Sequence, residues 1–379
     1  MKTNKQKYVI FAGGETAGPV MPLLALAKYW QDQDLAITPI FLDRKVSVAS
    51  HIVPKAGFEF KAISSGKLRR YWSFKNLASP FLLAFGFIQS IFLLRKLRPQ
   101  VVIGAGGYVQ VPVILAAWVL RIPRAIHQLD VAPTFSNRLM TPFVNAITTT
   151  FEKSIKDFPQ GSGLQLDYGK NNKIFWTGNP CDLDAKEVNT KASKEEAIKL
   201  FQLDPQWPTV LIIGGGTGAT GLNDGIAYNL PSLLKTVQII HSTGKGKRVN
   251  LPHDLPEVHD RYHQFEFIDR RDLAYAAADI VIARAGIATI SDLANLGKVS
   301  IIVPMPNSHQ GDNAELLFNQ KAAVVVDQSE LYELAIDKMI KKILFDPKLQ
   351  KILSENIQNI FPKNAEQKML KVILNIINE

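Results

Sequence analysis

Short runs of Val, Ile and other apolar residues recur along the whole chain, separated by longer segments with the 3.6-residue period of a helix. Runs that are apolar at successive positions are typical of strands buried on both faces in a parallel sheet. The sequence predicts strands at residues 8–14, 37–43, 58–64, 101–107, 124–130, 146–150, 174–178, 209–216, 237–244, 265–269, 280–286, 299–305 and 322–328. We therefore expect an α/β protein with two doubly wound parallel sheets.

The two halves of the chain begin alike. Each opens with a strand that runs into a glycine-rich turn and then a helix, at Phe11-Ala12-Gly13-Gly14 and at Ile212-Ile213-Gly214-Gly215-Gly216. This repeat predicts two Rossmann-like domains that face a cleft. The polar, Lys- and Glu-rich stretch 182–199 places the boundary near Pro180, which gives domains 1–180 and 181–362. A final amphipathic helix, 363–379, is expected to pack back on the first domain.

Positive charge is concentrated in the first 150 residues, which hold 18 Lys and Arg against 6 Asp and Glu, whereas the remainder holds 26 against 28. A basic surface attracts phosphate on nucleic acids, on anionic lipid headgroups or on small ligands. No aromatic stacking signature is interleaved with the basic residues, so we expect no nucleic acid partner. An ordinary solvated surface is the alternative interpretation.

Cations also border the apolar part of this half. A basic and aromatic stretch at 67–74 precedes the apolar segment 81–94, which closes with Arg95-Lys96-Leu97-Arg98. This pattern predicts peripheral attachment to an anionic membrane surface, with a core helix as the alternative. At 14 residues, with Gln89 and Ser90 inside it, the segment is expected to be too short to span a bilayer. The residues predicted to face the membrane are Lys67, Arg69, Arg70, Trp72, Phe85 and Arg95.

Glycine-rich turns between a strand and a helix let backbone N–H groups approach a phosphate closely. The chain has three, at 13–18, 104–108 and 214–221. Residues 216–221 spell G-x-G-x-x-G, but the next strand ends in His241-Ser242-Thr243 rather than in the acidic residue of a dinucleotide site. This argues against NAD there, whereas Asp43 keeps a dinucleotide open at the first turn.

Polar residues in the second half suit a sugar nucleotide. Asp292 lies in the first turn of a predicted helix, where a carboxylate can accept hydrogen bonds from both ribose hydroxyls. The loop 308–313 carries amide side chains, which can both donate to and accept from sugar hydroxyls. The alternatives are a residue favoured by the helix dipole at Asp292 and a surface loop with a helix cap at 308–313.

Together these strings resemble the MurG family, peripheral membrane glycosyltransferases that add N-acetylglucosamine to undecaprenyl-diphosphate-linked muramoyl-pentapeptide in peptidoglycan synthesis. The resemblance covers nearly the whole chain. It rests on Val102-Ile103-Gly104-Ala105-Gly106-Gly107-Tyr108-Val109, Thr177-Gly178-Asn179-Pro180, Gly214-Gly215-Gly216-Thr217-Gly218-Ala219, His241-Ser242-Thr243-Gly244-Lys245-Gly246, Phe267-Ile268-Asp269 and His309-Gln310 with Asn313-Ala314. It implies a GT-B type fold and a location on the cytoplasmic face of the cell membrane.

The resemblance also implies roles for individual residues. Ile268 would pair with uracil beside Phe267, Asp292 would hold the ribose, and the turn after residue 213 would receive the diphosphate of UDP-GlcNAc. The donor residues implied are Gly215, Gly216, Thr217, Gly218, Asn223, Phe267, Ile268, Ala288, Thr289, Asp292, Gln310 and Asn313. The residues implied for the undecaprenyl-linked lipid acceptor are Gly14, Thr16, Gly18, Gly107 and Tyr108, with His127 and Asp130.

The sequence departs from the family pattern mainly on the acceptor side. Pro19 stands where the family has a histidine, and His127-Gln128-Leu129-Asp130 replaces His-Glu-Gln-Asn. Asp182 replaces an arginine, Gly216 replaces a serine and Asp292 replaces a glutamate. Since Pro19 cannot take a proton, the predicted general base is His127 or Asp130, with Glu15 as a third candidate.

The transfer implied is inverting and requires no cofactor, because the glycine turn can stabilise the leaving diphosphate; Mg²⁺ remains possible, and no metal ligands are assigned. Asp182-Leu183-Asp184 spells a D-x-D metal motif as the alternative. Three other functions stay open: a transferase of the same fold with another lipid acceptor, a UDP-sugar epimerase, and a non-catalytic protein that binds nucleotide sugars.

Overall fold

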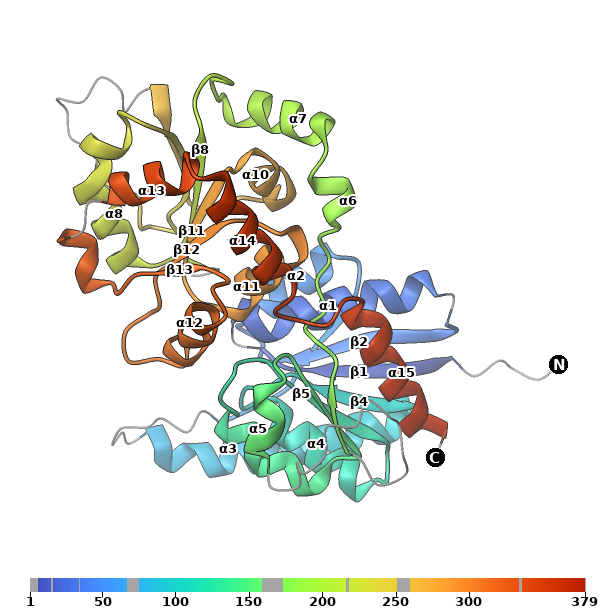
Figure 1. Ribbon diagram of the computed structural model, residues 1–379. Coiled ribbons are helices and arrows are strands. Elements are labelled where there is room, and N and C mark those ends of the chain that lie inside the picture. The colour runs from blue at the N-terminus through green and yellow to red at the C-terminus, as the bar shows by residue number, and fades with distance from the viewer. Residues whose placement is uncertain are drawn as a thin grey trace. The chain divides into compact units, whose positions relative to one another are not determined.

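The computed structural model describes residues 6–14, 16–33, 35–66, 75–158, 173–215, 218–250, 260–333 and 336–378, with the backbone alone at 75–79. The chain forms two compact units, shown in Figure 1. Unit 1 comprises Met1–Asp182 and Phe361–Glu379, and unit 2 comprises Leu183–Ile360. The chain therefore leaves unit 1, builds all of unit 2, and returns.

Unit 1 is built on a seven-stranded parallel sheet in the order β3-β2-β1-β4-β5-β6-β7. The strands are β1 (Lys7–Ala12), β2 (Ile37–Asp43), β3 (Glu59–Ala62), β4 (Val101–Gly104), β5 (Arg124–Gln128), β6 (Ala146–Thr149) and β7 (Ile174–Trp176). The strand order reverses between β1 and β4, which pair with each other. In a doubly wound sheet, ligands bind outside the carboxyl ends of the strands at this reversal.

Helices cover both faces of this sheet because successive residues of each strand point to opposite sides. Val9 and Phe11 pack against α1 (Ala17–Asp32), α2 (Ala49–Lys55) and the final helix α15 (Ala365–Asn378). Ile10 and Ala12 face the layer of α3 (Lys75–Leu97), α4 (Gln110–Val119) and α5 (Phe135–Met140). Met369, Leu370 and Ile373 lie on the buried stripe of α15. Two short helical turns, η1 (Thr141–Phe143) and η2 (Lys153–Asp157), also belong to unit 1.

Unit 2 has a six-stranded parallel sheet in the order β10-β9-β8-β11-β12-β13. Its strands are β8 (Thr209–Ile213), β9 (Gln238–Ser242), β10 (Tyr262–Phe265), β11 (Ile280–Ala283), β12 (Ser300–Ile302) and β13 (Val324–Val325). Its helices are α6 (Ala185–Val188), α7 (Lys191–Phe201), α8 (Thr220–Leu233), α10 (Arg271–Ala277), α11 (Ile287–Leu296), α12 (Gln310–Asn319), η3 (Ser329–Tyr332), α13 (Ile336–Leu344) and α14 (Pro347–Gln358). The order reverses between β8 and β11.

Two doubly wound parallel sheets confirm the predicted fold class, and twelve of the thirteen predicted strands overlap a strand of the structure over most of its length. Most strands end two or three residues earlier than predicted, because the residues that follow them already belong to turns. The prediction of a strand at 265–269 is wrong. The strand there is β10, Tyr262–Phe265, and Phe267 and Ile268 lie in the turn after it, where Phe267 is exposed. The polar residues His263 and Gln264 hid this edge strand from the apolar pattern.

The prediction that no segment is long enough to cross a membrane is also wrong. Within α3, Pro80–Leu97 is helical over 18 residues with a mean hydropathy of 1.5, which suffices by length and composition. Gln89 and Ser90 do not interrupt the helix, because the side chain of each has a hydrogen-bond partner. Gln89 Oε1 accepts from the backbone N–H of Ser64 at 2.8 Å, and Ser90 Oγ donates to the carbonyl of Gly86. Length alone does not separate a spanning helix from one that lies on a domain.

Candidate functional site

The predicted donor residues of unit 2 gather at the carboxyl ends of its strands. Gly215 and Gly218 follow β8, and Phe267 and Ile268 follow β10. The remaining residues lie in the first two turns of α11 and in the first turn of α12: Ala288, Thr289, Asp292, Gln310 and Asn313. Since β8 and β11 flank the reversal of strand order, the glycine turn and α11 occupy the position at which such sheets bind ligands.

The turn between β8 and α8 requires glycine at two described positions. Gly215 and Gly218 have φ of 86° and 69°, and the Gly218 N–H donates to the Gly215 carbonyl at 2.9 Å. A Cβ on Gly218 would overlap the carbonyl of Thr243, so a side chain there would push the turn away from the end of β9. Gly216 and Thr217, which were predicted to receive the diphosphate, lie outside the described residues.

Asn223, which was predicted to lie near the transferred sugar, has contacts within the protein. Its side chain is buried, and its Nδ2 donates to the carbonyls of Thr243 and Lys247, both at 3.0 Å. Its Oδ1 lies 3.2 Å from Nε2 of the buried His241, whose Nδ1 lies 2.7 Å from the Tyr262 hydroxyl. Asn223 therefore fixes the loop after β9.

Lys247 was not predicted as a site residue. Its Nζ donates to the carbonyl of Gly218 at 3.2 Å, which places a cation at the glycine turn. The signal was present, because Lys247 directly follows the Gly244-Lys245-Gly246 string that supported the family resemblance. A cation beside a turn rich in backbone N–H groups increases the attraction for a diphosphate.

Asp292 is paired with Arg271. The carboxylate is buried except for 6% of its residue surface, and Nη1 of Arg271 donates to both of its oxygens, at 2.8 and 2.7 Å. Arg271 is the first residue of α10, which follows the turn with Phe267 and Ile268. The pair thus joins the predicted uracil turn to the predicted ribose carboxylate.

Two amide side chains lie beside the N-terminus of α11. Asn313 Nδ2 donates to the Ala285 carbonyl at 3.1 Å, and the side chain is fully buried. Gln310 Oε1 accepts from the Met305 N–H at 3.0 Å, and its Nε2 lies 3.9 Å from where a Cβ on Gly286 would stand. Gln310 is half-buried beside the N-terminus of α11, which suits contact with a sugar, whereas Asn313 mainly holds the turn.

The predicted acceptor residues of unit 1 lie after β1 and β4, again at the reversal of strand order. A Cβ on Gly14 would overlap the buried carboxylate of Asp43, and one on Gly107 would lie 3.3 Å from the Gly14 carbonyl. Thr16 is the exposed N-cap of α1, and Gly18 lies inside that helix rather than in the loop. Tyr108 is half-buried in the turn after β4.

A buried network of amide side chains, which was not predicted from the sequence, supports these turns. Gln110 Oε1 accepts from the Gly106 N–H at 2.9 Å, and its Nε2 donates to Asn137 Oδ1 at 2.6 Å. Asn137 Nδ2 donates to Gln128 Oε1 at 2.6 Å, and Gln128 Nε2 donates to the Asp130 carbonyl at 2.8 Å. Isolated amides carry no local pattern, so only the fold brings these three together.

His127 is less accessible than a general base that meets an acceptor hydroxyl would be expected to be. Its ring is fully buried, with Nδ1 at 2.8 Å from Thr148 Oγ1 and Nε2 at 2.9 Å from Asn179 Oδ1. Burial lowers the pKa of His127 to about 4, so the neutral ring is held between two partners. Asp130 lies after the end of β5 and is half-buried, while Glu15 lies outside the described residues.

The D-x-D string and the predicted membrane residues can also be placed. Asp182 pairs with Lys28 at 3.0 Å, and Asp184 caps α6 by accepting from the Lys186 N–H at 2.8 Å. Both carboxylates therefore have partners within the protein. Phe85 and Arg95 are exposed on α3, whereas Lys67, Arg69, Arg70 and Trp72 lie outside the described residues.

Comparison with known proteins agrees with this arrangement. Residues 9–149 match the glycosyltransferase family 28 N-terminal domain and residues 209–369 match the C-terminal domain. The chain is 30% identical over 379 residues to the UDP-N-acetylglucosamine–N-acetylmuramyl-(pentapeptide) pyrophosphoryl-undecaprenol N-acetylglucosamine transferase 2 of Bacillus cereus, covering 98% of this chain and 99% of that one. The chain belongs to the MurG family. The corresponding transferase of Flavobacterium psychrophilum is 32% identical over 98% of each chain.

Solved structures share the fold of this MurG family member. Acinetobacter baumannii MurG superposes with a TM-score of 0.69 at 23% identity, over 97% of this chain and 99% of that one. A UDP-GlcNAc 2-epimerase from Neisseria meningitidis gives 0.67 at 14% identity, over 97% and 99%. At these identities the likeness establishes the GT-B fold, which both kinds of enzyme use.

Proposed function

We propose that this protein transfers N-acetylglucosamine from UDP-GlcNAc to undecaprenyl-diphosphate-linked MurNAc-pentapeptide, with inversion at the anomeric carbon. The observation that carries the proposal is the Arg271–Asp292 pair, which orients one carboxylate beside the uracil turn, at the strand reversal where the glycine turn also lies. The names of the full-length relatives support the choice of donor and acceptor.

On the donor side, Asp292 accepts the ribose hydroxyls, and the Ile268 backbone pairs with uracil beside exposed Phe267. Backbone N–H groups of the glycine turn, the N-terminus of α8 and Lys247 together face the diphosphate. Their positive potential stabilises the negative charge that grows on UDP as it leaves. We propose that these groups make a metal unnecessary, with Mg²⁺ at most an accessory. Turnover that persists in excess EDTA supports this, and turnover abolished by EDTA contradicts it.

On the acceptor side, Asp130 is the favoured general base. It takes the proton of the acceptor hydroxyl while that oxygen bonds to the anomeric carbon and the carbon–oxygen bond to the diphosphate breaks. UDP leaves with the bonding electron pair. Gly14, Gly107 and Tyr108 border the proposed position of the lipid diphosphate, where backbone N–H groups of two glycine turns meet.

The decisive experiment incubates the protein with UDP-GlcNAc, with and without the lipid-linked muramoyl acceptor, and measures UDP release and the sugar product. The proposal expects UDP release that depends on the acceptor. An epimerase, which the fold likeness favours as a second candidate, would convert the sugar without any acceptor. Calorimetric binding of UDP-GlcNAc without turnover would instead indicate a non-catalytic binding protein.

We also propose peripheral attachment to the cytoplasmic face of the cell membrane through α3. Phe81, Phe85 and Phe92 are among its exposed side chains, and Arg95 and Lys96 follow at its end. Apolar side chains enter the headgroup region while the cations attract anionic lipids. Flotation with anionic vesicles should weaken as salt is raised. Flotation that ignores ionic strength, or none at all, contradicts this part of the proposal.

A further inference from the structure

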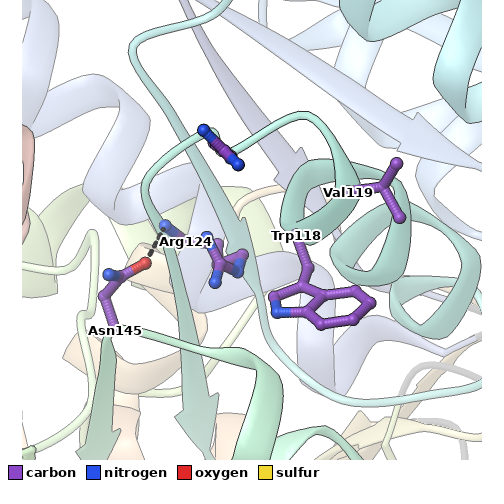
Figure 2. Close-up of a pocket in the computed structure, with 5 residues that line it drawn as sticks. Trp118, Val119, Arg124 and Asn145 are labelled. Carbon is purple, nitrogen blue, oxygen red and sulfur yellow. Dashed lines mark hydrogen bonds between the residues drawn. The ribbon is translucent and has the colours of Figure 1, made fainter.

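Unit 1 has a cavity at the amino ends of its strands, the edge opposite to the glycine turns. Its volume is about 570 Å³. Figure 2 shows Trp118 and Val119 lining it from the end of α4, Arg124 from the first residue of β5 and Asn145 from the turn before β6. Arg121 completes the lining. Neither the donor nor the acceptor proposal uses any of these residues.

The cavity carries positive charge that lacks an acidic counterpart. Arg121 and Arg124 line it, and Arg124 Nε donates to the Phe143 carbonyl and Nη1 to the Ile122 carbonyl. Lys173 is outside the lining but close enough to Arg124 to be repelled by it, and its Nζ donates to the Thr141 carbonyl. Burial lowers the pKa of Arg124 and of Lys173, and repulsion from Arg124 lowers the pKa of Lys173 further. No ion pair is seen for either residue, or for Arg121, within the described part of the chain.

The sequence around the cavity explains this imbalance. Residues 75–150 contain one acidic residue, Asp130, which follows the carboxyl end of β5 at the opposite edge of the sheet. The same stretch contains the cations Lys75, Arg95, Lys96, Arg98, Arg121, Arg124 and Arg138. Charge that is not compensated by the protein favours an anionic ligand.

The cavity opens in the most apolar part of the unit 1 surface. Helices α3, α4 and α5 pack side by side on one face of the sheet, as Figure 1 shows. They expose nine large apolar side chains: Phe81, Leu82, Phe85, Ile88, Phe92, Trp118, Val119, Phe135 and Leu139. Among the other described residues of unit 1, only Val46 is a comparably exposed large apolar side chain. A ligand here would meet cations and apolar surface together.

We propose that this cavity binds the phosphate headgroup of one anionic phospholipid of the bilayer. Arg121 and Arg124 face the phosphate. Asn145 Oδ1 accepts from the backbone N–H of Arg124 at 3.1 Å. This contact leaves the Nδ2 donors of Asn145 for phosphate oxygens. Trp118 and Val119 lie against the glycerol and the first acyl carbons. The inference rests on the membrane attachment proposed above and deepens it from diffuse attraction to a defined lipid site.

The chain offers a matched pair of variants. Arg121 and Arg98 are both exposed, both lie beyond helix ends at the amino edge of the sheet, and have φ of 56° and 49°. Asparagine tolerates this left-handed conformation, so Arg121→Asn and Arg98→Asn remove one charge each at little backbone cost. Arg98 does not line the cavity. Any difference between the variants in lipid binding therefore reports the cavity rather than net charge.

Partitioning is measured by sedimentation with vesicles of equimolar phosphatidylcholine and phosphatidylglycerol. We expect Arg98→Asn to lower the partition coefficient about fivefold, the effect of one cation near an anionic surface. Arg121→Asn should lower it about tenfold further, because a charge-assisted contact to phosphate is also lost. Equal losses in the two variants, or no vesicle binding by the unmodified protein, overturn the proposal.

Two further measurements identify the occupant. Lipids brominated near the glycerol should quench Trp118, so the Trp118→Phe variant should lose part of the quenching; unchanged quenching contradicts the site. Calorimetry with inorganic phosphate tests a soluble anion. Suppose that Arg121→Asn abolishes phosphate binding and that the two variants bind vesicles equally. The ligand of the cavity would then be a free anion, and the lipid proposal would be refuted. Transfer to a short-chain acceptor without vesicles tests the transferase function separately, and both Asn variants should retain it.

Discussion

Nη1 of Arg271 binds both carboxylate oxygens of Asp292, at 2.8 and 2.7 Å, and so joins the first residue of α10 to the second turn of α11. Asp292 is one methylene shorter than the glutamate that the family pattern predicts. A charge-assisted contact of this kind fixes the direction of a carboxylate. The pair therefore presents the shorter side chain in one orientation beside the turn that is proposed to hold the base.

Replacing Asp292 with asparagine should weaken donor binding. The amide loses the anionic acceptor for two ribose hydroxyls, and hydrogen bonds to charged groups contribute about 1.5–3 kcal/mol. We expect KM for UDP-GlcNAc to rise about 10- to 100-fold with a smaller change in kcat, as measured by UDP release. Asp272→Asn is the control, because Asp272 pairs with Arg270 at the surface. An unchanged KM in Asp292→Asn refutes the ribose role.

Replacing Arg271 with alanine should lower stability. The change leaves the nearly buried Asp292 carboxylate without this partner, and we expect the free energy of unfolding to fall by about 2 kcal/mol in urea titrations. Arg270→Ala removes a guanidinium one position away that forms exposed pairs with Asp272 and Glu196. That control should change stability by less than about 1 kcal/mol. Equal effects of the two variants would contradict a special role for Arg271.

The Asp130→Asn variant tests the proposed base. An amide cannot take the acceptor proton, so kcat should fall about 100-fold or more while KM for UDP-GlcNAc stays near its original value. His127→Gln, in the same segment, should reduce kcat far less, because the buried ring is held by Thr148 and Asn179. If a transfer assay shows that His127→Gln lowers kcat more than Asp130→Asn does, His127 is the base and this prediction is wrong.

Lys247→Met should slow the chemical step. The variant keeps an unbranched side chain but removes the cation that contacts the Gly218 carbonyl. Because charge grows on the diphosphate as UDP leaves, we expect kcat to fall about 10- to 100-fold. Lys245→Met is the matched control, since Lys245 is exposed and two residues away. If Lys245→Met lowers kcat by the same factor, the effect of Lys247 comes from net charge and not from its position at the glycine turn.

Stability should fall as the solution becomes acidic. Burial lowers the pKa of His127 in unit 1 to about 4 and that of His241 in unit 2 to about 3. The unfolded histidine binds a proton near pH 6.5, so the contribution of each neutral ring is full above that pH and is lost as pH falls toward its folded pKa.

The loss due to each histidine approaches about 1.4 kcal/mol per pH unit between these limits. Urea unfolding of His127→Gln at pH 7 and pH 5 should show a smaller difference than that of the unmodified protein. His51→Gln, which changes an exposed histidine, should keep the original difference. A pH difference in His127→Gln that equals that of the unmodified protein would contradict this account.

The sequence predicted the fold well because the core strands are buried on both faces and carry their signal locally. Ile10 and Phe11 face opposite helix layers, so neither side of the strand could be polar. The signal failed at β10, an edge strand whose His263 and Gln264 broke the apolar run. It also failed at α3, where Gln89 bonds to Ser64 and Ser90 to Gly86 in the same helix, so that both polar residues leave the helix intact.

The candidate site was predicted only in part, since a motif gives a residue's position along the chain but not its partners. Asp292 and Gln310 lie where the turns and helices predicted them. Asn223 and His127 were assigned to ligands, yet their polar atoms are used within the protein. Lys247 and Arg271 gain their roles from contacts across 29 and 21 residues of sequence, which no local pattern specifies.

The return of the chain to unit 1 has a consequence for biosynthesis. Helix α15 supplies Met369, Ile373 and Ile376 to the same core as Val9 and Phe11. On the ribosome, all residues of unit 2 emerge before this helix does, so the middle of the polypeptide can close its core while the beginning still waits for its last hydrophobic layer. A nascent chain stalled near residue 360 would therefore present chaperones with an open amino-terminal half beside a finished carboxyl-terminal one.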